Sequence, residues 1–219
     1  MITYETLRQN DAISTYIIKA DESLAALGFT EHSFPHVCKV AQTAEYILNA
    51  TGARPRQVEL ARIAAYLHDI GNLINRTDHS QSGAVMAFRI LDKMGMDPEE
   101  MATVVTAIGN HDEGTGVPVN TVAAALIIAD KSDVRRSRVR NRNIAAFDIH
   151  DRVNYSVEKS TLNVDSSRKL LVLELTVDTE FSPVMDFFEI FLNRMRMCRQ
   201  AAETLGLTFR LVINGQQMV

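Results

Sequence analysis

The chain of 219 residues is 46% hydrophobic, which is enough for one sizeable buried core with a small appended subdomain. Its 23 basic and 27 acidic residues give a formal net charge of −4, which excludes a global electrostatic attraction to nucleic acid or to an anionic membrane. The longest apolar stretch, residues 122–129, is far shorter than the roughly 20 residues that span a bilayer, and the polar start lacks the apolar segment of a signal peptide. We therefore expect a globular, cytoplasmic protein.

The first 150 residues carry the apolar periodicity of consecutive helices, with capping residues at their ends. Helices are expected over about residues 11–27, from near Pro35, over 55–70, over 80–94, and from residue 97 to near residue 109. The segment Asp97-Pro98-Glu99-Glu100 is the strongest start signal, because it combines an N-cap, a proline at the first helical position and an acidic third position. Asn120 or Thr121 is expected to cap a further helix that contains the apolar stretch 122–129.

The periodicity changes after about residue 151. Residues 152–164 and 171–177 alternate between apolar and polar side chains on either side of the turn 165–167, which predicts a β-hairpin. An amphipathic helix is expected over residues 183–205, followed by a strand over 207–213 that joins the hairpin as an edge or third strand. The predicted fold is mainly α, with a helical bundle in residues 1–150 and a C-terminal α+β extension of hairpin, helix and strand in residues 151–219, packed on the bundle.

His68 and Asp69 form an adjacent polar pair at the end of the apolar run 64–67. A carboxylate buried beside an imidazole is costly unless a partner holds it. A divalent metal ion is the simplest partner, because both groups bind such an ion in their unprotonated forms. Further metal-capable side chains lie on the buried sides or at the ends of the other predicted helices: His36, His79, His111 and Asp130. Mixed imidazole and carboxylate ligands suit Fe, Mn, Zn or Ni better than Ca.

This ordered set resembles the HD superfamily of metal-dependent phosphohydrolases, in which a histidine is followed by a His-Asp pair and then by an aspartate. The resemblance covers roughly residues 33–133 and includes the Ile-Gly extension of the doublet. Its most specific motifs are His36-Val37 with Val40-Ala41, His68-Asp69-Ile70-Gly71, His111 before a glycine-rich loop, and Ile127-Ile128-Ala129-Asp130. The resemblance implies an HD-type helical bundle and a set of ligands for one metal, namely His36, His68, Asp69 and Asp130.

The resemblance also implies a second ion, since His79 and His111 are similar to the additional ligands of a two-metal branch in which Asp69 bridges both ions. A carboxylate has two oxygens and can serve two cations. The implied cofactors are one or two divalent ions, with Fe, Mn, Zn, Ni or Mg as candidates. His32 lies one turn before His36 and shares its helix face, but we keep it outside the ligand set.

Such a site is expected to act as a hydrolase, because a metal lowers the pKa of water from 15.7 toward roughly 7 and the activated water attacks phosphorus. Asp69 and His68 are the predicted catalytic residues. Asp69, or a loop carboxylate such as Asp112 or Glu113, is the candidate to orient the water or to accept its proton.

The sequence departs from the family just after the doublet, where many members have a lysine and this chain has Asn72. We predict substrate contacts at Asn72, Arg76, Lys131 and Arg135, with Arg76 or Lys131 in place of the missing ammonium. The basic segment 131–142 either gathers phosphate groups at the mouth of the pocket or forms a solvated or subunit-contacting face. The pair Asn110-His111 and the loop 114–118 also differ from the His pair and the Gly-Tyr-Pro signature of the cyclic-dinucleotide branch, so cyclic di-GMP is not the favoured substrate.

The sequence therefore predicts a metal-dependent phosphohydrolase, either a phosphomonoesterase or a phosphodiesterase, acting on a nucleotide or another small phosphoester. The alternative is a catalytically weak nucleotide-binding or regulatory module, because Asn72 and Asn110 stand where active branches often have Lys and His. An RNA contact at the basic segment is disfavoured by the acidic overall charge. The expected partner is a small phosphorylated substrate, with no membrane or nucleic acid partner. Residues 151–219 either cover the pocket or pair two subunits into a homodimer through an edge strand.

Overall fold

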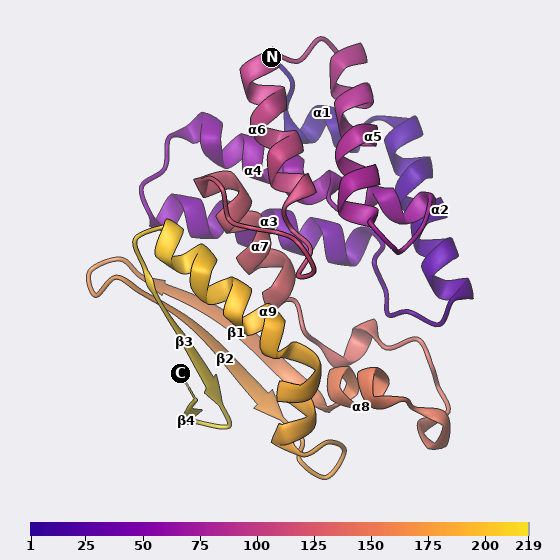
Figure 1. Ribbon diagram of the computed structural model, residues 1–219, viewed down its shortest axis with the longest axis vertical. Coiled ribbons are helices and arrows are strands. Elements are labelled where there is room, and N and C mark those ends of the chain that lie inside the picture. The colour runs from indigo at the N-terminus through magenta and orange to yellow at the C-terminus, as the bar shows by residue number, and fades with distance from the viewer. Residues whose placement is uncertain (219) are drawn as a thin grey trace.

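The computed structural model describes residues 1–218 and divides into a helical bundle and a small sheet layer (Figure 1). The bundle consists of α1 (Tyr4–Arg8), α2 (Asp11–Ala26), α3 (Phe34–Ala50), α4 (Pro55–Leu67), the 3₁₀ turn η1 (Ile70–Leu73), α5 (His79–Lys93), α6 (Pro98–Gly109) and α7 (Thr121–Ser132). Short 3₁₀ turns η2 (Arg136–Arg138) and η3 (Ile144–Ala146) lead into the C-terminal part. The mainly helical fold class is thus confirmed.

The predicted caps define the ends of the helices that carry the site. The Asp97 carboxylate accepts hydrogen bonds from the backbone N–H groups of Glu99 and Glu100, at 3.0 and 3.2 Å, and so starts α6. The Asn120 side chain accepts from the N–H of Ala123 at 2.8 Å and starts α7. Both side chains satisfy donors that a helix leaves unbonded in its first turn.

Helix α7 is the centre of the molecule. It packs against α3, α4 and α6 of the bundle and against α9 of the sheet layer, and its side chains are buried on all sides. A helix that is apolar around its whole circumference is stable only when other elements surround it. The buried side chains of the bundle and of the sheet layer consequently belong to one continuous core.

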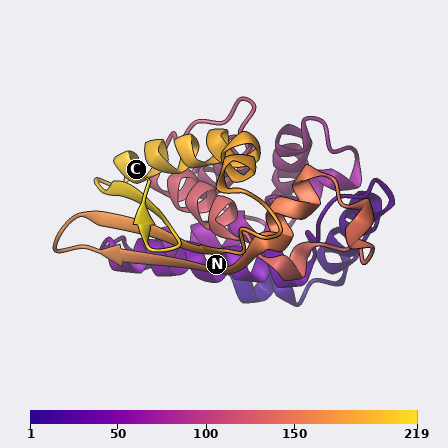
Figure 2. The ribbon, with the colours of Figure 1, turned by 90° about the horizontal axis from the view of Figure 1, so that it is seen from below.

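The C-terminal part contains α8 (Ile149–Ser156), β1 (Val157–Asp165), β2 (Leu170–Val177), α9 (Val184–Thr204), β3 (Thr208–Ile213) and β4 (Gln216–Gln217). The strands lie in the order β1-β2-β3-β4, with β1 antiparallel to β2 and β2 parallel to β3. Figure 2 shows α9 lying across one face of this sheet. The predicted hairpin is confirmed, and the last long strand is a third strand, whose outer edge pairs with β4 only at Val212 and Ile213.

Two details of the predicted C-terminal part are wrong. Residues 152–156 belong to helix α8, because the Asp148 side chain accepts a hydrogen bond from the N–H of Asp151 at 2.8 Å and caps a helix there. The strand predicted from residue 152 therefore begins only at Val157, as β1. The amphipathic pattern of residues 183–205 places Leu192 on the apolar side of the predicted helix, but in α9 this side chain is 50% exposed.

In residues 1–218, no helix is long and apolar enough to cross a membrane.

Candidate metal centre

The predicted metal ligands meet where several helices end or begin. His36 lies in the first turn of α3, His68 directly follows α4 with Asp69 next to it, and His79 starts α5. His111 follows α6 and its cap residue, and Asp130 lies in the last turn of α7. The four histidines and Asp69 are buried, and the Asp130 side chain is 12% exposed. The fold thus brings together every residue that the sequence predicts as a metal ligand.

One group of ligand atoms comprises two histidine nitrogens and two carboxylate oxygens. The Nε2 atom of His36 lies 3.5 Å from Asp69 Oδ2 and 3.3 Å from Asp130 Oδ1. The Nε2 atom of His68 lies 3.2 Å from Asp69 Oδ2 and 3.6 Å from Asp130 Oδ1. His36 Nε2, His68 Nε2 and Asp69 Oδ2 are buried without a hydrogen-bond partner. Buried polar atoms are ordinarily paired, so this cluster fits a bound cation.

The other oxygen of Asp69 faces a second pair of histidines. Asp69 Oδ1 lies 3.5 Å from His79 Nε2 and 4.0 Å from His111 Nε2. The two Nε2 atoms lie 3.1 Å apart, and the Nδ1 atom of each ring faces a backbone carbonyl oxygen. When Nδ1 carries the proton, both Nε2 atoms present lone pairs to each other, an arrangement that a cation between them relieves. The two oxygens of Asp69 therefore serve two neighbouring groups of donors.

All four histidines are oriented by their Nδ1 atoms. Three of these atoms face backbone carbonyl oxygens three residues earlier in the chain: Ala65 for His68 at 2.7 Å, Ile108 for His111 at 2.7 Å, and Arg76 for His79 at 3.1 Å. The carbonyls at helix ends lack intrahelical partners, and His68 and His111, which follow α4 and α6, each satisfy one of them. Partners of this kind fix the tautomer that leaves Nε2 free for a metal.

His36 is oriented instead by Asp133, whose Oδ2 atom lies 2.8 Å from its Nδ1. Asp133 is not among the site residues predicted from the sequence. Its only local signal is a carboxylate three positions after Asp130, and the partner of that carboxylate is 97 residues away in the chain. Asp133 is also held by Arg135, whose Nε lies 2.9 Å from Oδ1.

Asp133→Asn tests this orienting contact. An amide accepts a hydrogen bond less strongly than a carboxylate, so the variant is expected to lower metal affinity by about 10- to 100-fold, the usual effect of losing such a partner. A metal titration followed by calorimetry measures the change. Affinity equal to that of the unaltered protein would show that Asp133 does not orient His36.

The ionisable groups of the site shift one another's pKa values. Burial alone lowers the pKa of His68, but the neighbouring Asp69 and Asp130 carboxylates outweigh burial and raise it to about 10. Burial opposes ionisation of the two carboxylates, yet their pKa values are well below the usual range, mainly because of His68 for Asp69 and Lys131 for Asp130. Burial lowers the pKa of His79 and His111. The site thus brings the carboxylates of Asp69 and Asp130 into contact with the cationic side chains of His68 and Lys131.

A cavity of about 410 Å³ opens onto these residues. It is lined at one end by Asp69, His79, His111 and Asp130, and elsewhere by residues 27–30 before α3 and by residues of α8 and α9. His32, which we kept outside the ligand set, also lines the cavity, and its ring centroid lies 5.4 Å from that of His36. The C-terminal part of the chain therefore forms one wall of the cavity.

The predicted substrate contacts occupy different places. Arg76 lines the cavity, with Nη1 4.0 Å from Asp69 Oδ1. Asn72 is buried and donates a hydrogen bond from Nδ2 to Asp69 Oδ1 at 3.0 Å, so it contacts the doublet itself. Lys131 is buried and forms ion pairs with two carboxylates. Arg135 is not among the residues lining the cavity.

The basic segment mostly contacts the protein itself. Arg138 is buried and donates to the carbonyl oxygens of Glu31 and Asp133, each at 2.9 Å. Arg140 pairs with the Asp21 carboxylate, and Arg136 donates to the carbonyl of Tyr155. These arginines anchor the segment between the bundle and α8. Two residues of the segment, Lys131 and Arg138, also line the cavity.

Three comparisons show what this chain is similar to. A family model described as HD domain matches residues 34–151, more than half of the chain. An uncharacterised protein of Methanocaldococcus jannaschii is 24% identical over 200 residues, which cover 81% of this chain and 76% of that protein. The crystal structure of a predicted HD superfamily hydrolase from an uncultured Thermotogales bacterium is 28% identical, covers 57% of this chain and 67% of its own, and has a TM-score of 0.44.

Proposed function

This chain belongs to the HD domain family, and on that basis we propose that it is a metal-dependent hydrolase of a small phosphoester. The observation that carries the proposal is the cluster of buried, unpartnered ligand atoms at His36, His68 and Asp69. These three side chains and Asp130 would hold one ion, and His79, His111 and the second oxygen of Asp69 would hold another. Divalent ions lower the pKa of water toward neutrality and offset the charge that develops on phosphoryl oxygens.

The surrounding residues favour a small substrate with a phosphate group. The cavity of about 410 Å³ is near the lower end of the roughly 300–1,000 Å³ found for small-molecule sites, so it suits one mononucleotide-sized compound. Arg76 borders the predicted metal ligands, and its guanidinium is available to pair with phosphate oxygens at this end of the cavity.

Of the two loop carboxylates, Asp112 is the better candidate to accept a proton. Its Oδ1 lies 3.9 Å from His79 Nε2 and its side chain is 29% exposed. Glu113 pairs with the side chains of both Lys131 and Arg194, and these cations lower its pKa despite burial. A carboxylate that two cations hold is a weak base.

The proposal is tested by the metal content of the purified protein and by phosphate release from a panel of nucleotides and sugar phosphates with added Mn, Fe, Co or Ni. We expect bound metal and metal-dependent release from at least one mononucleotide. A protein that binds none of these metals, and whose phosphate release is unchanged by Asp69→Asn, would contradict the mechanism.

The alternative of a nucleotide-binding module without turnover rests on Asn72 and Asn110. In the structure Asn72 holds Asp69 through a hydrogen bond, and Arg76, one turn later, places a cation at the cavity. This arrangement favours the hydrolase, because the charge missing at residue 72 is present nearby. Nucleotide-induced thermal stabilisation with no phosphate release under any metal would favour the module instead.

Metal binding is expected to release a proton. Because the pKa of His68 is raised to about 10, this imidazole is protonated near pH 7.5 in the absence of metal, and a metal binds only its unprotonated form. Affinity should therefore rise about tenfold per pH unit up to roughly pH 10 and then level off, since each bound ion displaces one proton. Calorimetry in two buffers of different ionisation enthalpy measures the number released. Equal heats in the two buffers would show that His68 holds no such proton.

A further inference from the structure

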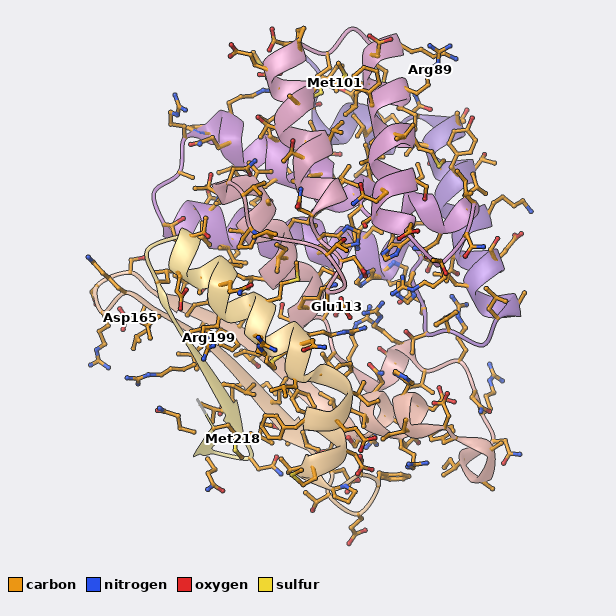
Figure 3. The ribbon with its side chains drawn as sticks, in the orientation of Figure 1. Arg89, Met101, Glu113, Asp165, Arg199 and Met218 are labelled. Atoms are coloured by element: carbon orange, nitrogen blue, oxygen red, sulfur yellow. The ribbon has the colours of Figure 1, made fainter. Side chains whose placement is uncertain are left out.

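A chain of ion pairs connects α9 to the carboxylate of Asp130. The Nε atom of Arg194, on α9, lies 2.8 Å from Oε1 of Glu113, which belongs to the loop between α6 and α7. Oε2 of Glu113 lies 2.6 Å from Nζ of Lys131, and the same ammonium lies 2.8 Å from Oδ2 of Asp130. Figure 3 shows Glu113 beside α9, between this helix and the bundle. A residue of the sheet layer is thereby linked to a predicted metal ligand.

The two oxygens of Asp130 have different neighbours. Oδ2 pairs with Lys131, whereas Oδ1 lies 3.3 Å from the Nε2 atom of His36 and 3.6 Å from that of His68. A carboxylate held at one oxygen presents the other in a fixed direction, and such holding contacts strongly influence the affinity of a metal site. Lys131 thus determines which oxygen of Asp130 faces the histidine nitrogens.

The buried ammonium of Lys131 requires a second carboxylate as counter-charge if Asp130 is also to bind a metal. Its side chain is 5% exposed, and a buried ammonium is tolerated only with counter-charges in contact. If Asp130 were the sole counter-charge, its negative charge would be committed to Lys131 and less of it would attract a cation at Oδ1. Glu113 shares the ammonium with Asp130, and so leaves Asp130 able to act as a ligand.

Glu113 is in turn held in place by α9. Its loop has no regular structure, and the contact with Arg194 joins it to a residue 81 positions later. The guanidinium of Arg194 lies over the ring of Phe191, 4.7 Å from its centroid, so α9 itself fixes the position of this cation. The HD domain match ends at residue 151, and the contact therefore comes from outside the matched region.

We propose that Arg194 is a positioning residue of the metal centre, which acts through Glu113 and Lys131 to hold the Asp130 carboxylate in its ligand orientation. Helix α9 then contributes to metal binding in addition to lining the cavity. This inference rests on the proposed metal centre and adds to it a dependence on the C-terminal part of the chain.

The Arg194→Gln variant distinguishes a positioning role of Arg194 from a purely electrostatic effect of its charge on metal affinity. Removing a positive charge near a cation site strengthens cation binding on Coulombic grounds alone, whereas the loss of a positioning contact weakens it. We expect Arg194→Gln to weaken Co²⁺ binding by about tenfold or more and to change the visible absorption of bound Co²⁺. Arg194→Lys should recover most of the affinity, since an ammonium also pairs with Glu113. Unchanged or tighter Co²⁺ binding by Arg194→Gln would overturn the proposal.

The matched control is Arg199→Gln. Arg199 lies on the same helix, nearer its C-terminal end (Figure 3), is exposed, and forms no ion pair within residues 1–218. This variant removes the same charge from α9 and should leave the Co²⁺ affinity and spectrum unaltered. A loss equal to that of Arg194→Gln would show that α9 acts through its overall charge, which also overturns the proposal.

The order of the ion pairs, from Glu113 through Lys131 to Asp130, is tested by combining substitutions. Glu113→Gln is expected to weaken Co²⁺ binding in the unaltered protein but to have little further effect in a Lys131→Met background, because its influence passes through Lys131. An undiminished effect of Glu113→Gln in the Lys131→Met background would mean that Glu113 acts on the metal centre without Lys131, contrary to the proposed series of ion pairs. These variants carry the test if Arg194→Gln melts at a much lower temperature than the parent, as judged by circular dichroism.

Failure of this inference is distinguishable from failure of the proposed function. A parent protein that binds no Co²⁺ contradicts the metal centre itself. A parent that binds Co²⁺ with a ligand-field spectrum, together with an unaffected Arg194→Gln variant, contradicts only the role of α9.

Discussion

Asp69→Asn is expected to abolish metal binding and to lower phosphate release at least about a thousandfold. Asp69 is the only predicted ligand whose two oxygens face both groups of histidines, with Oδ2 toward His36 and His68 and Oδ1 toward His79 and His111. Asparagine preserves the shape of the side chain, but its amide nitrogen cannot coordinate a cation. A thousandfold loss of rate corresponds to about 4 kcal/mol of lost transition-state stabilisation, which is what we expect the bound metal to contribute.

The measurements for this variant are metal content by mass spectrometry and initial rates under saturating metal. Asp92→Asn is the control, because Asp92 is exposed on α5 and makes no contact with the site. The control should retain the metal and the rate of the parent. An Asp69→Asn variant that keeps a full complement of metal would contradict the bridging position of this carboxylate.

Gly71→Ala is expected to destabilise the fold by about 3 kcal/mol, which lowers the melting temperature by roughly 6–12 °C. Residue 71 lies where η1 crosses α5, and a Cβ atom there would overlap the carbonyl oxygen of His79 and come within 2.5 Å of the Gly83 nitrogen. These are backbone atoms, so relief requires the two segments to separate. Because His79 starts α5, the separation would also displace a predicted metal ligand.

Gly109→Ala provides the matched comparison. A Cβ atom at residue 109 would meet only the Cβ of Ala84 at 3.6 Å and Gln81 Oε1 at 3.9 Å, which are ordinary contacts. Alanine is the better helix former, so this variant should be unchanged or more stable by about 0.5 kcal/mol. Thermal unfolding with a chelator present isolates the stability of the fold from metal binding. Equal melting temperatures for the two variants would show that the close crossing at residue 71 does not exist.

The sequence predicted the helical bundle well because its signals are local. The Asp97 and Asn120 caps each involve residues within three positions, and they start α6 and α7 as expected. The same locality caused an error at α8, where alternation in residues 152–156 indicated a strand while the Asp148 cap produced a helix. Two local signals competed there, and the cap prevailed.

The candidate ligands were also identifiable in advance, since His and Asp side chains at the ends of apolar helices need a common partner. Their supporting contacts were not. Asn72 hydrogen-bonds to Asp69, and Lys131 forms ion pairs with Glu113 and Asp130. Asp69 and Asp130 are near these residues in the sequence, but the orientations that produce the contacts are set by the packing of the helices.

The sequence by itself determined the order of the helices, the hairpin, and the set of imidazoles and carboxylates that converge on one site. Periodicity, capping and the cost of burying a charge all act through residue type and short spacing. Only the tertiary structure decided that Asp133 orients His36, that Asn72 hydrogen-bonds to Asp69, and that α9 reaches the site through Arg194. Such contacts depend on angstrom-scale distances between side chains that lie on different elements, and packing alone sets those distances.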